Sequence, residues 1–216
     1  MGAKLALADY LKASTWPLHS EAESTGVVAD ILHQRVRLAD YLNFTQNLSE
    51  VYSALERETD WLRPYPKLQE YVSPMIYRRS QLEHDKVQLL ASNSFISLKP
   101  IYAVTLDYCE HIRQAQNNSP AAMLAHIYVR YLGDLNGGQV LKRLVKSTLG
   151  VPDDCLTFYD FQKVENLKQF RLEFREALNV ILLTEAERMA AAQSAMAAFR
   201  FNIALSAACQ SQDSLD

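Results

Sequence analysis

The chain has 216 residues, of which 49% are hydrophobic, so it can bury a core of its own and is expected to form a single domain over residues 1–216. Its 22 Lys and Arg residues against 25 Asp and Glu residues give a formal charge of −3. That charge provides no general attraction to nucleic acids or to an anionic membrane, and we expect neither as a partner.

The three cysteines, Cys109, Cys155 and Cys209, lie far apart and outside any CxxC motif. They predict neither a disulfide framework nor a zinc site, and they fit a reducing compartment. No run approaches the roughly 20 apolar residues that span a bilayer, and the N-terminal segment lacks the features of a signal peptide. We expect a soluble, cytoplasmic monomer without a membrane anchor.

Hydrophobic periodicity predicts an all-α protein, because apolar residues recur at spacings of three and four along most of the chain. Pro17 fits a helix only in the first turn or at a kink, so His19 is expected near a helix start or just past a bend. The ordered core is expected over residues 5–206, followed by a short polar tail. The expected helices cover Leu5–Lys12, a stretch that carries His19 and ends near Gly26, Val27–Gln34, Leu38–Trp61, Pro66–Val72, Gln81–Asn93, Pro100–Gln116, a long helix within Ser119–Gly150, Asp160–Leu178, and a last helix from a capping box at Thr184 to Cys209.

The long helix has the clearest ends, with Ser119 as its N-cap and Gly150 after its last turn. Its interior holds Gly133, Gly137 and Gly138, which are half of the six glycines in the chain. A glycine in a helix interior costs about 1 kcal/mol relative to alanine and provides a place to bend. We therefore expect a compensating role for this segment.

Gly133 and Gly137 are four residues apart, so they leave one helix face without side chains. Such a face allows either another helix or a flat ligand to approach the backbone closely. Asp134 lies beside this face, and a carboxylate is rarely placed there without hydrogen-bond partners or water. The combination favours a wall that covers a ligand.

The segment Ala125–Leu144, AHIYVRYLGDLNGGQVLKRL, resembles the distal-helix signature of biliverdin-producing haem oxygenases of the soluble bacterial or cyanobacterial type. Asn136 stands where many members have Ser. The resemblance covers roughly Leu5–Asn202. It implies an all-α fold in which haem is held between a proximal helix and a glycine-kinked distal helix.

The segment Trp16–Gly26, WPLHSEAESTG, resembles the proximal segment of the same family. The resemblance implies that His19 binds the haem iron. Glu23 lies four residues later on the same helical face, where it can hydrogen-bond the other ring nitrogen. We interpret the remaining histidines as surface or ordinary packing residues, with His126 as a satisfied core histidine: His33, His84, His111 and His126.

The resemblance also implies a distal network of ordered waters. The positions that match its anchors are Tyr52, Tyr108, Arg130, Asp134 and Asn202. Tyr128 and Phe199 match aromatic residues that contact haem, although core packing would explain them equally well. Gly138 is expected to make the helix backbone more flexible beside the cofactor.

Cations at three positions, Lys12, Arg171 and Arg175, match those that hold the haem propionates in the family. Arg171 and Arg175 share a helix face with Lys168, and such a stripe is usually solvated. A further cation of the family is replaced here by Trp16. One propionate contact is therefore missing or supplied in another way.

The resemblance implies an enzyme that opens haem by oxidation with O2 and reducing equivalents, giving biliverdin, CO and ferrous iron. The alpha isomer is the expected product. Haem is both substrate and cofactor, and O2 is the co-substrate. The expected intermediate is a ferric hydroperoxide that a water network stabilises. The residues assigned to this chemistry are Asp134, Gly133, Gly137, Tyr52 and Arg130.

A basic patch of Lys142, Arg143 and Lys146 follows the glycines. It could dock an electron donor, either a ferredoxin or an NAD(P)H-dependent reductase, or it could be a solvated helix end.

Two other classes of protein remain as alternatives. One is a haem-binding carrier or sensor on the same fold without turnover. The other is a helical bundle with a di-iron site or a nucleophilic cysteine. The chain lacks paired Glu-x-x-His motifs, with Asp30-x-x-His33 as its nearest approach, and no cysteine has a recognisable partner.

Overall fold

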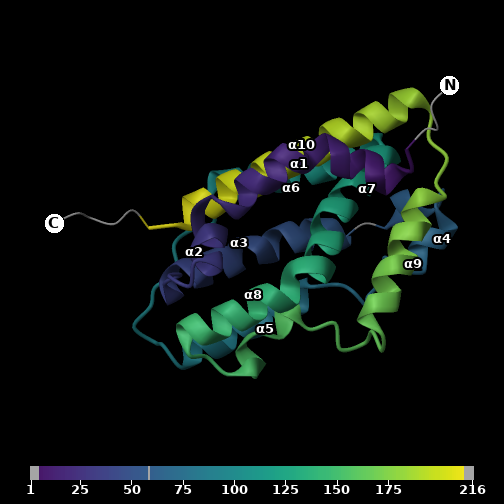
Figure 1. The fold of residues 1–216 in the computed structure, drawn as a ribbon. Helices are drawn as coiled ribbons and strands as arrows, with labels where there is room; N and C mark the ends of the chain where they lie inside the picture. Colours follow the sequence, from purple (N-terminus) through teal and green to yellow (C-terminus); the bar gives the residue numbers. More distant parts are fainter. Residues whose placement is uncertain (1–4, 58, 212–216) are drawn as a thin grey trace.

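The computed structural model describes residues 5–57 and 59–211, and these residues form helices and no β-strand (Figure 1). The α-helices are α1 (Leu7–Glu23), α2 (Gly26–Leu32), α3 (Leu38–Arg57), α4 (Pro66–Gln69), α5 (Arg79–Ala91), α6 (Ala103–Asn118), α7 (Pro120–Ile127), α8 (Gly133–Leu149), α9 (Leu167–Asn179) and α10 (Glu185–Cys209). Shorter helical turns are η1 (Asp60–Leu62), η2 (Tyr128–Leu132), η3 (Asp153–Cys155) and η4 (Thr157–Tyr159).

Helix α10 packs along α1 and α7, and Figure 1 shows α1 and α10 running side by side. Its buried face carries the small residues Ala191, Ala195 and Ala198, which let the neighbouring helices approach closely. The capping box predicted at Thr184 is confirmed, because the Thr184 hydroxyl accepts from the Glu187 amide and the Glu187 side chain accepts from the Thr184 amide. The predicted all-α architecture is therefore present, and α10 contacts α1, α2, α3, α6 and α7.

The segment around Pro17 was predicted as two elements, and this was wrong. Helix α1 runs from Leu7 to Glu23 with Pro17 inside it, so His19 lies well beyond the first turn. A proline removes one backbone hydrogen bond from a helix interior. Packing along α10 stabilises the continuous helix, since tertiary contacts contribute more to helix stability than local propensity does.

The long helix has the predicted ends, but its interior is not regular. The Ser119 hydroxyl accepts from the Ala122 amide, and Gly150 follows the last turn with φ 65°. Between them, the turn η2 (Tyr128–Leu132) is π-helical. Figure 1 shows the chain changing direction between α7 and α8. The irregular turn therefore directly precedes Gly133 and redirects the helix that carries the glycines.

The helix predicted over Asp160–Leu178 begins later, at Leu167. Asn166 is its N-cap, because its side chain accepts from the Gln169 amide. The preceding backbone is held by a tertiary contact, in which the Arg78 guanidinium donates to the Asp160 carbonyl (2.7 Å). That contact replaces the helical hydrogen bonds that periodicity predicted.

Other boundaries also differ from the prediction by a few residues. Helix α3 ends at Arg57 rather than Trp61, and Trp61 is buried in η1. Helix α10 ends at Cys209, as predicted for the last helix, so the ordered core extends beyond its expected end at residue 206. Residues 212–216 of the predicted tail lie outside the described residues.

The start of α2 lies directly against α10. Gly26 has φ 62°, and a Cβ built on it would lie 2.2 Å from the carbonyl carbon of Ser206. The Ser206 hydroxyl also donates to the Thr25 carbonyl and accepts from the Val28 amide, each at 3.0 Å. Both the backbone conformation and the close approach require glycine at this position.

We predict that Gly26→Ala lowers the free energy of unfolding by about 3 kcal/mol or more, because it adds left-handed backbone strain and a steric clash. Gly150→Ala is the matched control, since Gly150 also has positive φ but a Cβ there would meet nothing within 4 Å. The control should lose only about 1–2 kcal/mol. Urea unfolding of both variants measures the difference, and equal losses would contradict the role assigned to the close approach.

Candidate functional site

Among the cavities that are lined by predicted site residues, the larger lies between α1 and α8 and has a volume of about 380 Å³. A second cavity of about 320 Å³ adjoins it and shares His19, Gly133, Gly137 and Phe199. The first is lined by Lys12, Thr15, Trp16, His19, Tyr128, Val129, Leu132, Gly133, Asn136, Gly137, Arg175 and Phe199. Two lobes therefore meet at the point where His19 faces the glycines.

The α1 wall of the cavity follows from helical spacing. Trp16 follows Lys12 by four residues, and His19 follows Thr15 by four, which places the four side chains along one face. Thr15 is buried, and its hydroxyl donates to the Leu11 carbonyl (2.8 Å). The other three side chains are exposed. One imidazole and one ammonium group therefore face the cavity from this wall.

The α8 wall carries no side chain at Gly133 or Gly137. A Cβ built on either glycine meets nothing within 4 Å, so neither position packs against another helix. The sequence left helix packing open as an alternative for this face, and the structure contradicts it. Gly138 differs, since a Cβ there would lie 3.6 Å from the Tyr159 ring and Gly138 does not line the cavity. The bare face is open space.

His19 is bounded by three side chains. The nearest Glu23 oxygen lies 3.6 Å from His19 Nδ1, which is beyond the distance of a hydrogen bond. The Trp16 ring stacks on the imidazole with centroids 5.7 Å apart and planes within 10°. The Phe199 ring is tilted by 56° at 6.0 Å. The other edge of the imidazole is free to face the cavity that His19 lines.

Asp134 lies in a buried polar network formed with α3 and α10. The Tyr52 hydroxyl donates to the Asp134 carboxylate, and Arg130 donates to the Tyr52 hydroxyl (3.0 Å) and to Asn202 Oδ1 (3.0 Å). An Arg130 nitrogen lies 3.7 Å from the Asp134 carboxylate. None of these four residues lines either lobe. The network is therefore set back from the wall that Gly133 and Gly137 form.

In this network, burial and the neighbouring charged groups have opposite effects on the pKa values of Asp134 and Arg130. Burial raises the pKa of the Asp134 carboxyl, although the Arg130 guanidinium and the Tyr52 hydroxyl favour its charged form. Burial lowers the pKa of Arg130, but Tyr52 and Asp134 together raise it above its ordinary value. The Tyr52 hydroxyl has a raised pKa, mainly because it is buried. A carboxyl group whose affinity for protons is increased thus lies beside a fixed cation.

Several polar atoms near this network lack a hydrogen-bond partner within the described part of the chain. They are Arg130 Nε, both ring nitrogens of His126 and His111 Nε2. The rings of His111 and His126 lie 5.2 Å apart, and Tyr108 lies 5.8 Å from His126. Buried polar groups of this kind are commonly satisfied by ordered water. The prediction that His126 is buried was right, but the expected protein partners are missing.

The three cations predicted to hold propionates differ in placement. Lys12 and Arg175 line the cavity, and Arg175 forms an ion pair with Asp9. Arg171 does not line it and donates to the Leu135 carbonyl (3.3 Å). The structure therefore brings two of the three cations to the cavity. Lys168, on the same helix, is exposed.

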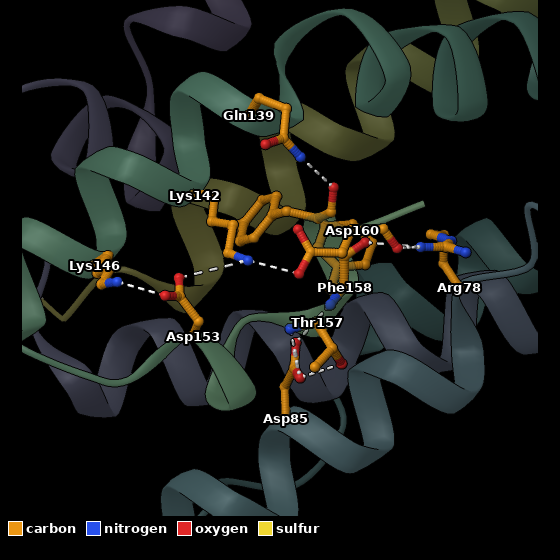
Figure 2. A network of polar contacts seen from close by, with 10 residues as sticks. Arg78, Asp85, Gln139, Lys142, Lys146, Asp153, Thr157, Phe158 and Asp160 are labelled. Atoms are coloured by element: carbon orange, nitrogen blue, oxygen red, sulfur yellow. Dashed lines mark hydrogen bonds and ion pairs between the residues drawn. The ribbon is translucent and has the colours of Figure 1, made fainter. Parts of the chain in front are cut away.

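The predicted basic patch is largely engaged in contacts within the protein (Figure 2). Lys142 donates to Asp160 (2.6 Å), and Lys146 donates to Asp153 (2.6 Å). Gln139 donates to the Tyr159 carbonyl (2.8 Å). Arg143 is exposed. These contacts attach α8 to the segment that contains η3 and η4.

That segment is in turn attached to α5, as Figure 2 shows. The buried Asp85 carboxylate accepts from the amide and hydroxyl of Thr157 (2.8 and 2.6 Å) and from the Phe158 amide (2.8 Å). The Arg78 side chain donates to the carbonyls of Phe158 (3.1 Å) and Asp160 (2.7 Å). A continuous set of polar contacts therefore links α5 to the side of α8 away from the cavity.

The structure does not support the alternative of a di-iron or cysteine-dependent bundle. Asp30 pairs with Arg35 (2.7 Å), and the ring of His33 lies within hydrogen-bond distance of the Ala29 carbonyl (2.7 Å). The described residues contain no cluster of three or more His, Cys, Asp or Glu side chains that could hold a metal ion. Burial raises the pKa of Cys109 to about 11 and that of Cys209 to about 12, and it also raises the pKa of Cys155. None is an activated thiolate.

Comparisons with known proteins agree with the geometry. The model of the haem oxygenase family matches residues 5–208. The chain belongs to the haem oxygenase family. A haem oxygenase 1 from Synechocystis sp. is 33% identical over 197 residues, which cover 91% of this chain and 82% of that protein.

Solved structures show the same fold. The crystal structure of haem oxygenase-1 from Synechocystis sp. PCC6803 in complex with haem has a TM-score of 0.84 and 32% identity, covering 94% of this chain and 91% of that chain. Haem oxygenase from Leptospira interrogans has a TM-score of 0.85 and 26% identity, covering 94% of this chain and 100% of that chain. The fold and family predicted from the glycine segment are thus confirmed.

Some cavity residues of this haem oxygenase were not predicted from the sequence. Thr15 lies four residues before His19, and Val129 lies four before Gly133, so helical spacing could have identified both. Leu132 and Asn136 flank Gly133 on the same wall. Conversely, six predicted site residues do not line the larger lobe of the cavity: Glu23, Tyr52, Arg130, Asp134, Gly138 and Arg171. Glu23 lines the smaller lobe.

Within residues 5–57 and 59–211, no helix has the length and apolar character needed to cross a membrane.

We predict that Gly137→Ala raises the free energy of unfolding of the ligand-free protein by up to about 1 kcal/mol, because alanine favours the helix and its Cβ enters open space. Gly138→Ala, which reaches only an ordinary contact with Tyr159, is the matched control and should be stabilised to a similar extent. Thermal unfolding measures both variants. A clear loss of stability in Gly137→Ala alone would mean that another part of the chain packs on this face.

Proposed function

We propose that this chain is a haem oxygenase that binds haem between α1 and α8 and opens it with O2 and reducing equivalents to biliverdin, CO and ferrous iron. The observation that carries the proposal is the position of the His19 imidazole in a cavity whose opposite wall is the bare backbone of Gly133 and Gly137. Membership in the haem oxygenase family supports the activity, and a solved relative in complex with haem supports the ligand.

The chemistry of the cavity fits haem. A flat, largely apolar macrocycle requires two facing walls without protruding side chains, and the open space at Gly133 and Gly137 provides one of them. His19 on the other wall would hold the iron through a ring nitrogen. The two lobes, of about 380 and 320 Å³, extend to either side of this point, so each can receive part of the ring.

The rim of the cavity fits the two carboxylates of haem. Lys12 and Arg175 line the larger lobe and would hold the propionates there. Because Arg175 is already paired with Asp9, a propionate would compete with that carboxylate for the guanidinium. Arg171 would have to leave the Leu135 carbonyl to take part. Tyr128 and Phe199 would contact the ring.

Glu23 would orient His19 after a small movement. Its carboxylate lies 3.6 Å from His19 Nδ1, and both side chains are about half exposed. A rotamer change that shortens this distance would allow Nδ1 to donate to the carboxylate while the other nitrogen binds iron. That hydrogen bond would fix the tautomer of the ligand.

Bound haem supplies the iron at which O2 is activated and the carbon that is oxidised. The residues of the chain would exclude bulk water and hold protons near the reacting atoms. The wall at Gly133 and Gly137 would direct O2 along the ring towards one meso edge, for which we propose the alpha position. Asp134, held by Tyr52 and Arg130, would act through water because it does not line the cavity.

The buried polar atoms support a distal water network. Arg130 Nε is a buried polar atom without a partner among the described residues, and Arg130 is one of the positions expected from the sequence. His111 and His126 add three such nitrogens on the adjoining helices α6 and α7. Waters that satisfy these atoms would connect the neighbourhood of Asp134 with α6.

An electron-donor protein, either a ferredoxin or an NAD(P)H-dependent reductase, completes the proposed reaction. The contacts of Lys142 with Asp160 and of Lys146 with Asp153 reduce the positive charge available for docking at the basic patch. Arg143 and Lys146 are both exposed, and Arg143 is the one that pairs with no carboxylate in the described part of the chain. We propose that any docking there depends mainly on Arg143.

We predict that His19→Ala loses the axial imidazole signature of the ferric haem complex and that its affinity for haem falls by roughly tenfold or more. Electron paramagnetic resonance and haem titration measure the two effects, and added imidazole should restore the signature. His33→Ala, an exposed histidine that does not line the cavity, is the matched control. An unchanged spectrum in His19→Ala would assign the ligand to another residue.

We predict that Asp134→Ala still binds haem but forms biliverdin about 100-fold more slowly, since a positioned proton-transfer group is lost. Asp134→Asn keeps an acceptor for Tyr52 and separates this loss from destabilisation. Asp107→Asn, an exposed carboxylate on α6, is the control. Chromatography of the products formed with haem and ascorbate gives both rate and isomer.

Biliverdin formation by Asp134→Ala at the wild-type rate would exclude the assigned role. Haem binding by the wild-type protein without any biliverdin would favour the carrier or sensor.

A further inference from the structure

Three side chains on α1 form a stack at the edge of the cavity. Lys12 Nζ lies 5.7 Å from the centroid of the Trp16 ring, and the Trp16 ring lies 5.7 Å from that of His19 with planes within 10°. Trp16 follows Lys12 by four residues and precedes His19 by three. Along the helix axis, the ammonium and the imidazole therefore lie on opposite sides of the indole.

Burial in the protein core does not explain this indole. Trp16 is 56% exposed, whereas the other tryptophan, Trp61, is 5% exposed. Both neighbours of Trp16 in the stack are functional groups of the cavity wall. A large aromatic ring left in water beside a cavity is expected to act on a ligand or on a side chain that binds one.

The orientation of His19 depends on few contacts. Glu23 is beyond hydrogen-bond distance at 3.6 Å, and the Phe199 ring is tilted by 56° against the imidazole. Trp16 is the ring that lies parallel to it. Rotation of the imidazole about its Cβ–Cγ bond would break this parallel contact, so the indole limits that rotation.

Geometry determines what the indole can do towards haem. An imidazole that binds iron through a ring nitrogen contains the iron–nitrogen bond in its plane, so that plane stands perpendicular to the macrocycle. An indole within 10° of parallel to the imidazole also stands perpendicular to the macrocycle. Trp16 therefore cannot stack flat on haem in this arrangement, and its contact is with the ligand of the iron.

We infer that Trp16 is a positioning residue that fixes the rotational angle of the His19 imidazole about the axis towards the iron. Lys12 stabilises the indole through a cation–π contact on its ring. The inference rests on the proposed function, since it requires that His19 binds haem iron. The direction of the imidazole plane sets the in-plane electronic asymmetry of a ferric haem, and neighbouring groups that orient a metal ligand tune the metal in this way.

The test compares Trp16→Ala and Trp16→Phe with the wild-type protein. The readouts are the electron paramagnetic resonance spectrum of the ferric haem complex and the hyperfine-shifted methyl resonances of its cyanide complex. We expect Trp16→Ala to keep an imidazole-bound iron, to change the spread of the methyl resonances, and to lower the affinity for haem by roughly tenfold. Trp16→Phe keeps an aromatic face and should return both readouts towards the wild type.

Phe95→Ala is the matched control, because Phe95 is an aromatic residue that is 83% exposed and does not line the cavity. It should leave the spectra unchanged. Because Trp16 is exposed, its replacement is expected to leave the fold intact, which circular dichroism checks.

The outcomes separate the two proposals. A wild-type complex with an imidazole signature, combined with wild-type methyl resonances in Trp16→Ala, would overturn the positioning role and leave the proposed function standing. A wild-type protein that shows no imidazole-bound haem would overturn the proposed function and, with it, this inference. A changed spread in Trp16→Ala that Trp16→Phe reverses supports the positioning role.

Discussion

The structure depends on keeping the space between α1 and α8 open. Apolar surfaces in a folded protein tend to pack together until no space remains, and a helix face without side chains would allow especially close packing. At Gly133 and Gly137 this packing has not occurred, because a Cβ there would meet nothing within 4 Å. Contacts elsewhere on α8 must therefore hold the helix away from α1.

The polar contacts in Figure 2 provide that restraint. Gln139, Lys142 and Lys146 lie on the side of α8 opposite to the bare face, as their helical spacing requires. They bind the segment that contains η3 and η4, and the buried Asp85 carboxylate fixes that segment to α5. Charge-assisted hydrogen bonds of this kind are directional, so they fix a position where apolar packing would permit sliding.

The first turn of α8 is held by a second restraint. Asp134 is bound by Tyr52 from α3 and lies close to Arg130, which also reaches Asn202 on α10. Removing one member of a buried charged network leaves the others unsatisfied, so the network is formed completely or not at all. The residues proposed for proton transfer therefore also position the wall that the ligand contacts.

Local signals in the sequence predicted the parts of this arrangement that depend on single helices. The caps at Ser119, Gly150 and Thr184 are present, because each needs only neighbouring backbone groups. Pro17 and the start of α9 were predicted wrongly, since packing along α10 and the contact of Arg78 with Asp160 overrode local preference. Such tertiary contacts have no local signal in the sequence.

The residues of the candidate site also differ in whether a local sequence signal could predict them. His19, Gly133 and Gly137 were recognised from motifs, and the structure brings them to one cavity. The basic patch could not be interpreted from the sequence, because its acidic partners Asp153 and Asp160 lie in a segment that was predicted partly as helix. Its charge, considered on α8 alone, left a docking surface and a solvated helix end as alternatives. In the folded protein, Lys142 and Lys146 instead hold the helix in the position that keeps the bare face open.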